Sequence, residues 1–157
     1  MMTFPDSVLQ FTYSHSPYYK SSCNDLSQLI EQSQQKVVSQ VNNALTILFW
    51  NIGRRINEEV LKNKRAEYAG QIVSTVSTQL KNQYGKNFEM RNLRRMMQFA
   101  TQFTDLNILI SLSSYLSWSH FVELLPLKSQ EARLFYTRLA VDGTIGTRDL
   151  RDCEYAL

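Results

Sequence analysis

The residues best suited to chemistry lie in one stretch, YGKNFEMRNLRRMMQF, which covers residues 84–99. This stretch holds three arginines, an asparagine and a glutamine within about two helical turns. The planar guanidinium of arginine matches phosphate oxygens and guanine edges, and the carboxamide of asparagine matches adenine. Together these residue types predict a surface that contacts nucleic acid.

A helical wheel separates this stretch into two faces. With Leu93 as the origin, the side chains of Met90, Met96, Met97 and Ala100 fall within about 60° and would face a core. The polar residues lie roughly 100–200° away, with the asparagine beside them. Two lysines that precede the helix would hold nearby phosphates. The predicted DNA-contacting residues are Arg91, Asn92, Arg94, Arg95, Gln98, Lys81 and Lys86.

The same pattern also fits a solvated helix face with no ligand, on which Glu89 could pair with one of the arginines. The pattern alone leaves both interpretations open. A second helix pair, Ser129–Asp142 followed by TRDLRD, repeats the layout after Gly143. There Arg148 and Arg151 stand among three carboxylates, so this pair is interpreted as a packing element.

Other chemistry is poorly supported. Ser119, His120 and Glu123 could meet across one helical turn, but neighbouring residues point in different directions and no oxyanion donor is indicated. Two histidines and two cysteines are widely scattered, which argues against zinc. The sequence has no P-loop and no dinucleotide fingerprint. We therefore expect no catalytic residue, metal, cofactor or small-molecule substrate in this chain.

Apolar periodicity predicts an all-α fold, a multi-helix orthogonal bundle with a long first helix and a helix-turn-helix-like unit. Helices are expected over about 25–62, 66–84 and 88–103. Four shorter ones follow, with predicted N-caps at Asp105, at Ser117 or Ser119, at Ser129 and at Thr147. The first helix should carry one apolar stripe, and its segment ALTILFW, residues 44–50, should be buried on more than one side. The stripe contains Ile30, Val37, Val41, Leu45, Leu48, Ile52 and Ile56.

Two glycines carry separate expectations. Gly53 lies inside the first helix, where glycine costs roughly 1 kcal/mol against alanine, so it predicts the close approach of another helix. Gly85 predicts a stop for the second helix in the left-handed region. A helix that ends at glycine, a short turn and a second helix rich in arginine is the layout of a helix-turn-helix reader.

The length and composition of the chain are those expected of one soluble domain. The chain has 157 residues, 43% of them hydrophobic and 20% charged, with a net charge of +3. We expect a flexible, tyrosine-rich arm over residues 1–24 and a single helical domain over residues 25–157. No secretory signal or membrane span is apparent, and Cys23 and Cys153 form no motif, so a cytoplasmic setting is expected.

Three blocks resemble the N-terminal domain of YhcG-type nucleases: ILFWNIGRRINEE, YGKNFEMRNLRRMMQF, and LSWSHFVELL followed by EARLFYTRLA. The resemblance covers roughly residues 26–150. It implies a bacterial, helix-turn-helix-like module that binds DNA, duplex DNA above all, for an attached PD-(D/E)xK nuclease domain. It does not assign contact residues. A tryptophan expected just after Gly143 is absent, which puts the role of the final helix in doubt.

The nuclease centre itself is missing from this chain. A PD-(D/E)xK site needs an acid two residues before a lysine, and no such triplet occurs. The alternative function is a protein-interaction or dimerisation module, in which the long first helix and the tyrosine-rich arm build a homodimer or dock another protein. In that case the arginines would be solvated or would meet acidic side chains.

Overall fold

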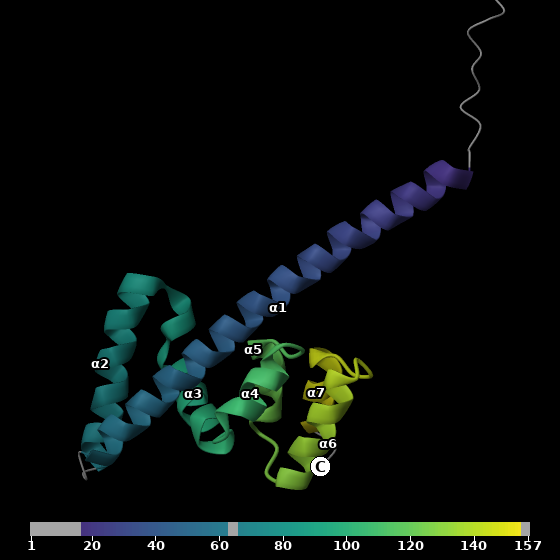
Figure 1. Ribbon diagram of the computed structural model, residues 1–157. Coiled ribbons are helices and arrows are strands. Elements are labelled where there is room, and N and C mark those ends of the chain that lie inside the picture. Colours follow the sequence, from purple (N-terminus) through teal and green to yellow (C-terminus); the bar gives the residue numbers. More distant parts are fainter. Residues whose placement is uncertain (1–16, 63–65, 155–157) are drawn as a thin grey trace, which may run out of the picture. The chain divides into compact units, whose positions relative to one another are not determined.

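A computed structural model describes residues 17–62 and 66–154, and the side chains of residues 22–62 and 69–152. This part of the chain contains seven α-helices and one 3-10 turn, without a strand (Figure 1). The expected all-α fold is confirmed. The chain divides into two compact units, the first ending at Val37 and the second beginning at Val38. Residues 1–16 of the expected arm lie outside the described residues.

The first helix, α1, runs from Pro17 to Lys62, so it begins well before the expected Asp25. The side chains that share the apolar stripe of α1 are not all buried. Ile30 and Val37 in the first unit are 58% and 56% exposed, and Leu48 in the second unit is 45% exposed. Periodicity shows which side chains share a face, but it does not show whether anything covers that face. Burial begins only where α1 enters the core of the second unit.

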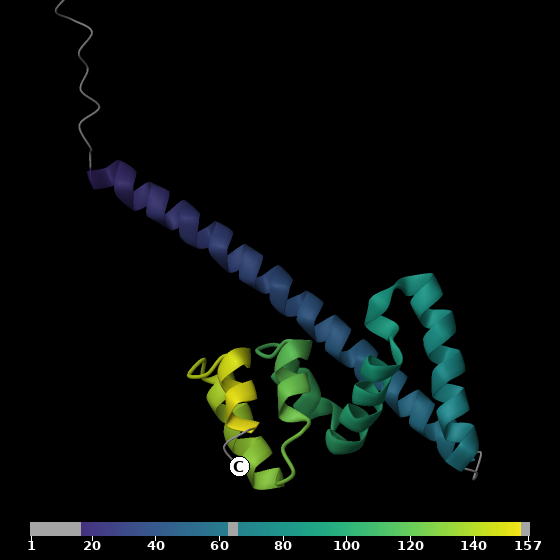
Figure 2. The same ribbon diagram turned by 180° about the vertical axis from the view of Figure 1, so that it is seen from behind.

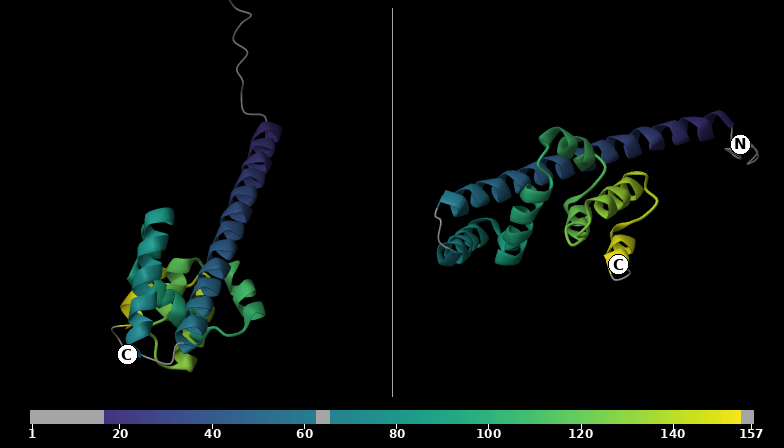
Figure 3. Two further views of the ribbon diagram at one scale, coloured as in Figure 1. Left: turned by 90° about the vertical axis from the view of Figure 1, so that its left-hand side faces the viewer. Right: turned by 90° about the horizontal axis from the view of Figure 1, so that it is seen from below.

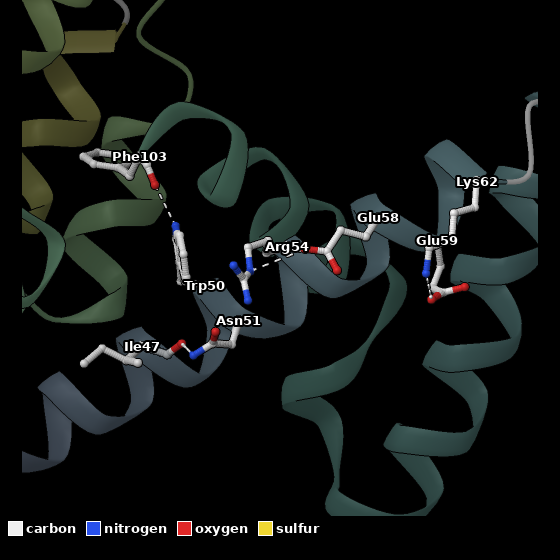
Figure 4. Close-up of polar contacts among 8 residues, drawn as sticks. All are labelled: Ile47, Trp50, Asn51, Arg54, Glu58, Glu59, Lys62 and Phe103. Atoms are coloured by element: carbon white, nitrogen blue, oxygen red, sulfur yellow. Dashed lines mark hydrogen bonds and ion pairs between the residues drawn. The ribbon is translucent and has the colours of Figure 1, made fainter. Parts of the chain in front are cut away.

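In the second unit, α1 is anchored through its side chains. Phe49, Trp50 and Ile56 are buried, and the Trp50 indole donates to the Phe103 carbonyl at 2.6 Å (Figure 4). The guanidinium of Arg54 lies over the Trp50 ring, 5.2 Å from its centroid. These contacts fix the rotation of α1 about its own axis.

Gly53 lies where α1 meets the third helix, α3, which spans Met90–Gln102. A Cβ atom at Gly53 would overlap the Met96 carbonyl oxygen, so any side chain would collide with that backbone. One turn further along α1, Asn57 Nδ2 donates to the Met97 carbonyl at 2.9 Å. The predicted close approach at Gly53 is confirmed.

In the sequence α1 is followed by α2, which spans Ala66–Tyr84. These are the bounds that its periodicity predicted. Gly85 follows with φ at 97°, a backbone region that favours glycine, although its ψ of −172° is not that of a left-handed helix residue. Lys86–Phe88 then form the 3-10 turn η1, so α3 begins at Met90 and not near Phe88. Ser77 Oγ donates to the Phe88 carbonyl at 3.0 Å and ties α2 to this turn.

Four short helices complete the second unit: α4, Leu106–Ser113; α5, Trp118–Leu124; α6, Gln130–Val141; and α7, Thr147–Glu154. The predicted N-caps at Asp105 and Ser129 are confirmed, and Ser117 rather than Ser119 caps α5. Within this unit α3 lies between α2 and the group formed by α5, α6 and α7 (Figures 2 and 3).

Two groups of buried side chains form the core of the second unit. One surrounds Leu93 and Met96 and receives α1 and α2, while the other surrounds Phe99 and Phe121 and receives the short helices. Trp118 packs against both groups. Its ring meets Phe49 and Phe99 edge-on, with centroids 5.0 and 5.2 Å away. The rotation of α3 is therefore fixed from two sides.

Candidate nucleic-acid interface

The two faces that the wheel predicted for α3 are present in the structure. Leu93, Met96 and Phe99 are fully buried. Arg91 and Arg94 are exposed, and Arg95 is half-buried. Because the buried side chains follow the spacing of one helix face, the arginines must emerge on the other side.

The three arginines of α3 carry charge that no described carboxylate neutralises. The ion pairs among the described side chains use Arg54, Lys62, Lys81 and Arg151 as their cations. Within residues 22–62 and 69–152, no carboxylate lies at ion-pair distance from Arg91, Arg94 or Arg95. An unpaired guanidinium keeps its donors available for an anionic ligand.

The two carboxamides of this face are instead bonded within the fold. Asn92 Nδ2 donates to the Asn87 carbonyl at 2.6 Å, and its Oδ1 accepts from the Trp118 indole at 3.2 Å. Gln98 Nε2 donates to the Leu125 carbonyl at 3.0 Å. Both side chains therefore tie α3 to its neighbours, which differs from the base-reading role that their types suggested.

The two predicted phosphate-binding lysines, Lys81 and Lys86, differ in whether a described carboxylate pairs with them. Lys81 Nζ lies 3.0 Å from a carboxylate oxygen of Glu89, and both side chains are 48% exposed. The hydrogen bond from Lys81 and its positive charge, with a smaller effect from Lys86, lower the pKa of Glu89. Glu89 therefore stays ionised at neutral pH and competes with any anionic ligand for Lys81. It pairs with that lysine and not with an arginine of α3.

Arg91 and Arg95 line a cleft of about 430 Å³ formed by η1, α3, α5 and the start of α7. Of the three arginines, Arg94 alone stands outside it. No sequence pattern indicated that α5 and α7 would contribute, since only the tertiary fold brings them to α3. The lining residues are Lys86, Asn87, Glu89, Arg91, Asn92, Arg95, Trp118, Ser119, Val122, Glu123, Thr147 and Arg151.

Positive charge dominates the lining, which holds four cationic side chains and two carboxylates. Glu123 accepts from Arg151 at 2.7 Å, and Glu89 is engaged by Lys81. The charges of Lys86, Arg91 and Arg95 are left without a carboxylate among the described side chains. A recess lined by charges of one sign concentrates the electric field and attracts ions of the opposite sign.

A hydrolytic centre does not form around His120. Its Nδ1 accepts from the backbone N–H of Ser117 at 3.2 Å and lies 2.9 Å from Ser117 Oγ, which makes a capping box at the start of α5. Glu123 is held by Arg151. Within the described residues no group of three side chains could hold a metal ion. Nor is any described helix both long and apolar enough to span a bilayer.

Comparison with known proteins agrees with the resemblance seen in the three sequence blocks. The family model described as "DUF1016 N-terminal domain" matches residues 25–153. An Escherichia coli (strain K12) protein, "Putative nuclease YhcG", is 27% identical over 150 residues. The match covers 76% of this chain and 40% of that protein, so the chain corresponds to less than half of its relative. No solved structure matches the chain.

Proposed function

We propose that this chain, which belongs to the DUF1016 N-terminal domain family, is a helical module that binds duplex DNA. One observation carries the proposal: the three arginines of α3 face outward without a carboxylate partner among the described side chains. Lys86 stands beside two of them in the lining of the cleft. In this proposal α2, η1 and α3 act as a helix-turn-helix-like unit.

The mode of contact follows from which side chains are available. Asn92 and Gln98 are held by bonds within the fold, whereas no bond to the three guanidinium groups is present among the described residues. Guanidinium and ammonium groups bind phosphate oxygens, which carry no sequence information. We therefore infer that the module holds the phosphate backbone and adds little base discrimination.

The proposed role in a larger protein is to place a nuclease domain on DNA. The E. coli relative is named a nuclease, and this chain matches 40% of its length. A module that binds DNA without regard to sequence would raise the local concentration of DNA at a tethered domain. The expected partner domain is of the PD-(D/E)xK type, and the expected compartment is the cytoplasm.

A salt titration of duplex affinity tests the proposal. Four phosphate contacts, by Lys86 and the three arginines, predict a slope of log affinity against log salt near −3.6, at about −0.9 for each contact. Replacing Arg91 and Arg95 together with alanine should reduce the slope by about 2 units and leave the thermal midpoint unchanged. Fluorescence anisotropy and a melting curve give both readings.

The matched control removes the same charge elsewhere. Arg55→Ala with Arg138→Ala takes two exposed arginines from α1 and α6, neither of which lines the cleft. This variant should change the slope by far less than the α3 variant. Equal effects of the two variants would mean that net charge, and not the face of α3, governs binding.

Self-association is a second candidate function, and α1 supplies the observation that favours it. In the first unit Leu26, Leu29, Ile30 and Val37 share one face of the helix, and each is 56–62% exposed. An isolated helix is marginally stable in water, and two copies of one apolar stripe are self-complementary. Sedimentation of the full chain against residues 38–157 separates the two functions, because only the full chain would then dimerise.

A further inference from the structure

We propose that the cleft between α3, α5 and α7 receives an unpaired strand of nucleic acid, so that the module prefers a duplex with a single-stranded overhang to a blunt one. This inference rests on the proposed function. It divides the three arginines of α3, Arg91, Arg94 and Arg95, into two groups. Arg94, which stands outside the cleft, contacts only the duplex, whereas Arg91 and Arg95 contact phosphates of a blunt duplex and also hold an unpaired strand where one enters the cleft.

The surroundings of Arg91 and Arg95 carry the inference. A helix that reads a duplex must enter a major groove about 12 Å wide, with its contact side chains unobstructed. Here the two arginines share a recess with side chains of two further helices, Ser119 and Val122 from α5 and Thr147 from α7. A single strand is narrow and flexible enough to follow such a recess, whereas a duplex is rigid.

The volume agrees with this assignment. Pockets that enclose small ligands measure about 300–1,000 Å³, and the cleft measures about 430 Å³. That space suits a single nucleotide with its phosphate and cannot hold a base pair together with both backbones. Proteins that bind single strands combine a positively charged groove with aromatic or apolar surface for the bases.

Both kinds of surface are present in the lining. Lys86, Arg91 and Arg95 supply cations for phosphates, while Trp118 and Val122 supply apolar surface for a base. Hydroxyl and carboxamide groups for the polar edges of a base come from residues Ser119, Thr147 and Asn87.

The floor of the cleft is already ordered. The Trp118 indole donates to Asn92, and Asn92 donates to the Asn87 carbonyl, so one chain of bonds joins α5, α3 and η1. The ring of Trp118 is held by edge contacts from Phe49 and Phe99. Arg151 is fixed on Glu123 by bonds from both Nε and Nη2. A preorganised site loses little entropy on binding, which favours recognition of one strand.

The test compares two fluorescent probes, a blunt duplex and the same duplex with a short thymidine overhang. The wild-type chain should bind the overhang probe about tenfold more tightly, within the range for one base in contact with an aromatic side chain. Arg91→Ala with Arg95→Ala should weaken the binding of both probes and should also remove the preference for the overhang. Arg94→Ala should weaken both probes by the same factor.

A variant that fills the cleft without changing charge provides an independent reading. Ser119 is exposed and lines the cleft, so Ser119→Trp should abolish the preference for the overhang and leave blunt-duplex affinity unchanged. Its thermal midpoint checks that the fold is intact.

Each outcome bears on the inference. Equal affinity of the wild-type chain for the two probes overturns the assignment of the cleft and leaves duplex binding standing. Loss of affinity for both probes in Ser119→Trp would mean that the cleft itself holds the duplex. Absence of binding to either probe overturns this inference and the proposed function together.

Discussion

At the scale of single residues, the polar face of α3 shows what a helical wheel can and cannot predict. The residues concerned are Arg91, Asn92 and Gln98. The wheel placed all three on the polar face of α3, because the direction of a side chain depends only on helix period. It could not distinguish a guanidinium without a partner among the described residues from the two bonded carboxamides. Asn92 accepts from Trp118 and Gln98 donates to Leu125, and these partners lie 26 and 27 residues away in the sequence. Only tertiary packing brings them within reach.

His120 gives a prediction for pH dependence at this scale. Burial lowers its pKa in the folded chain below the usual value near 6.5, and its Nδ1 must be unprotonated to accept from Ser117 N–H. The unfolded chain therefore binds the proton more readily than the folded chain. The stability contributed by neutral His120 is fully present above pH 6.5 and is lost as the pH falls through the lower pKa of the folded state.

The measurement is the free energy of unfolding at several values of pH between 7.5 and 5. The loss of the capping contact should cost about 1 kcal/mol, a typical value for an N-cap. His120→Gln should flatten the curve in this window, because glutamine also serves at this position of a capping box and does not titrate. A wild-type curve that matched the variant at every pH would contradict the assignment.

At the scale of the secondary-structure element, the sequence predicted the helices and several of their ends, but not the start of α1 or of α3. The bounds of α2 and the caps at Asp105 and Ser129 follow from local rules, because capping and periodicity act within a few residues. The burial of the apolar stripe of α1 could not be predicted, for the opposite reason. Whether Val37 or Leu48 is covered depends on elements far along the chain. The cleft could not be predicted for the same reason, since α5 and α7 reach α3 only in the folded unit.

Gly53 and Gly70 give a matched test of helix packing. Gly53→Ala drives a Cβ into the Met96 carbonyl and should destabilise the chain by about 2–3 kcal/mol, as overpacking does. Gly70 lies within α2, and outside its chain neighbours and its own helix backbone no described atom lies within 4 Å of an added Cβ. Gly70→Ala should therefore stabilise the chain by about 0.5–1 kcal/mol. Urea denaturation measures both; a neutral Gly53→Ala would show that α1 and α3 are further apart than described.

At the scale of the whole molecule, the division at residue 37 predicts that the second unit folds without the first. Every described side chain from residue 22 to residue 37 is exposed, and the buried residues begin at Thr46. A chain of residues 38–157 should therefore keep its thermal midpoint and its duplex affinity within about twofold, a difference of roughly 0.4 kcal/mol.

A shorter chain is the control for that truncation. Residues 52–157 lack Phe49 and Trp50, which are 4% and 6% exposed in the core. Loss of a buried aromatic side chain costs about 3–5 kcal/mol, so this chain should unfold at a much lower temperature. Circular dichroism melting curves distinguish the two truncations. A large drop in the midpoint for residues 38–157 would show that the first unit supports the second.

The position of Trp118 between the two groups of core side chains also makes it an optical reporter. The chain has two tryptophans, and Trp50 does not line the cleft. In a Trp50→Phe background, the emission of Trp118 would respond to a molecule entering the cleft, to loosening of α3 and to global unfolding. Occupancy of the cleft and stability of the fold could then be measured in one sample by tryptophan fluorescence, without an attached dye.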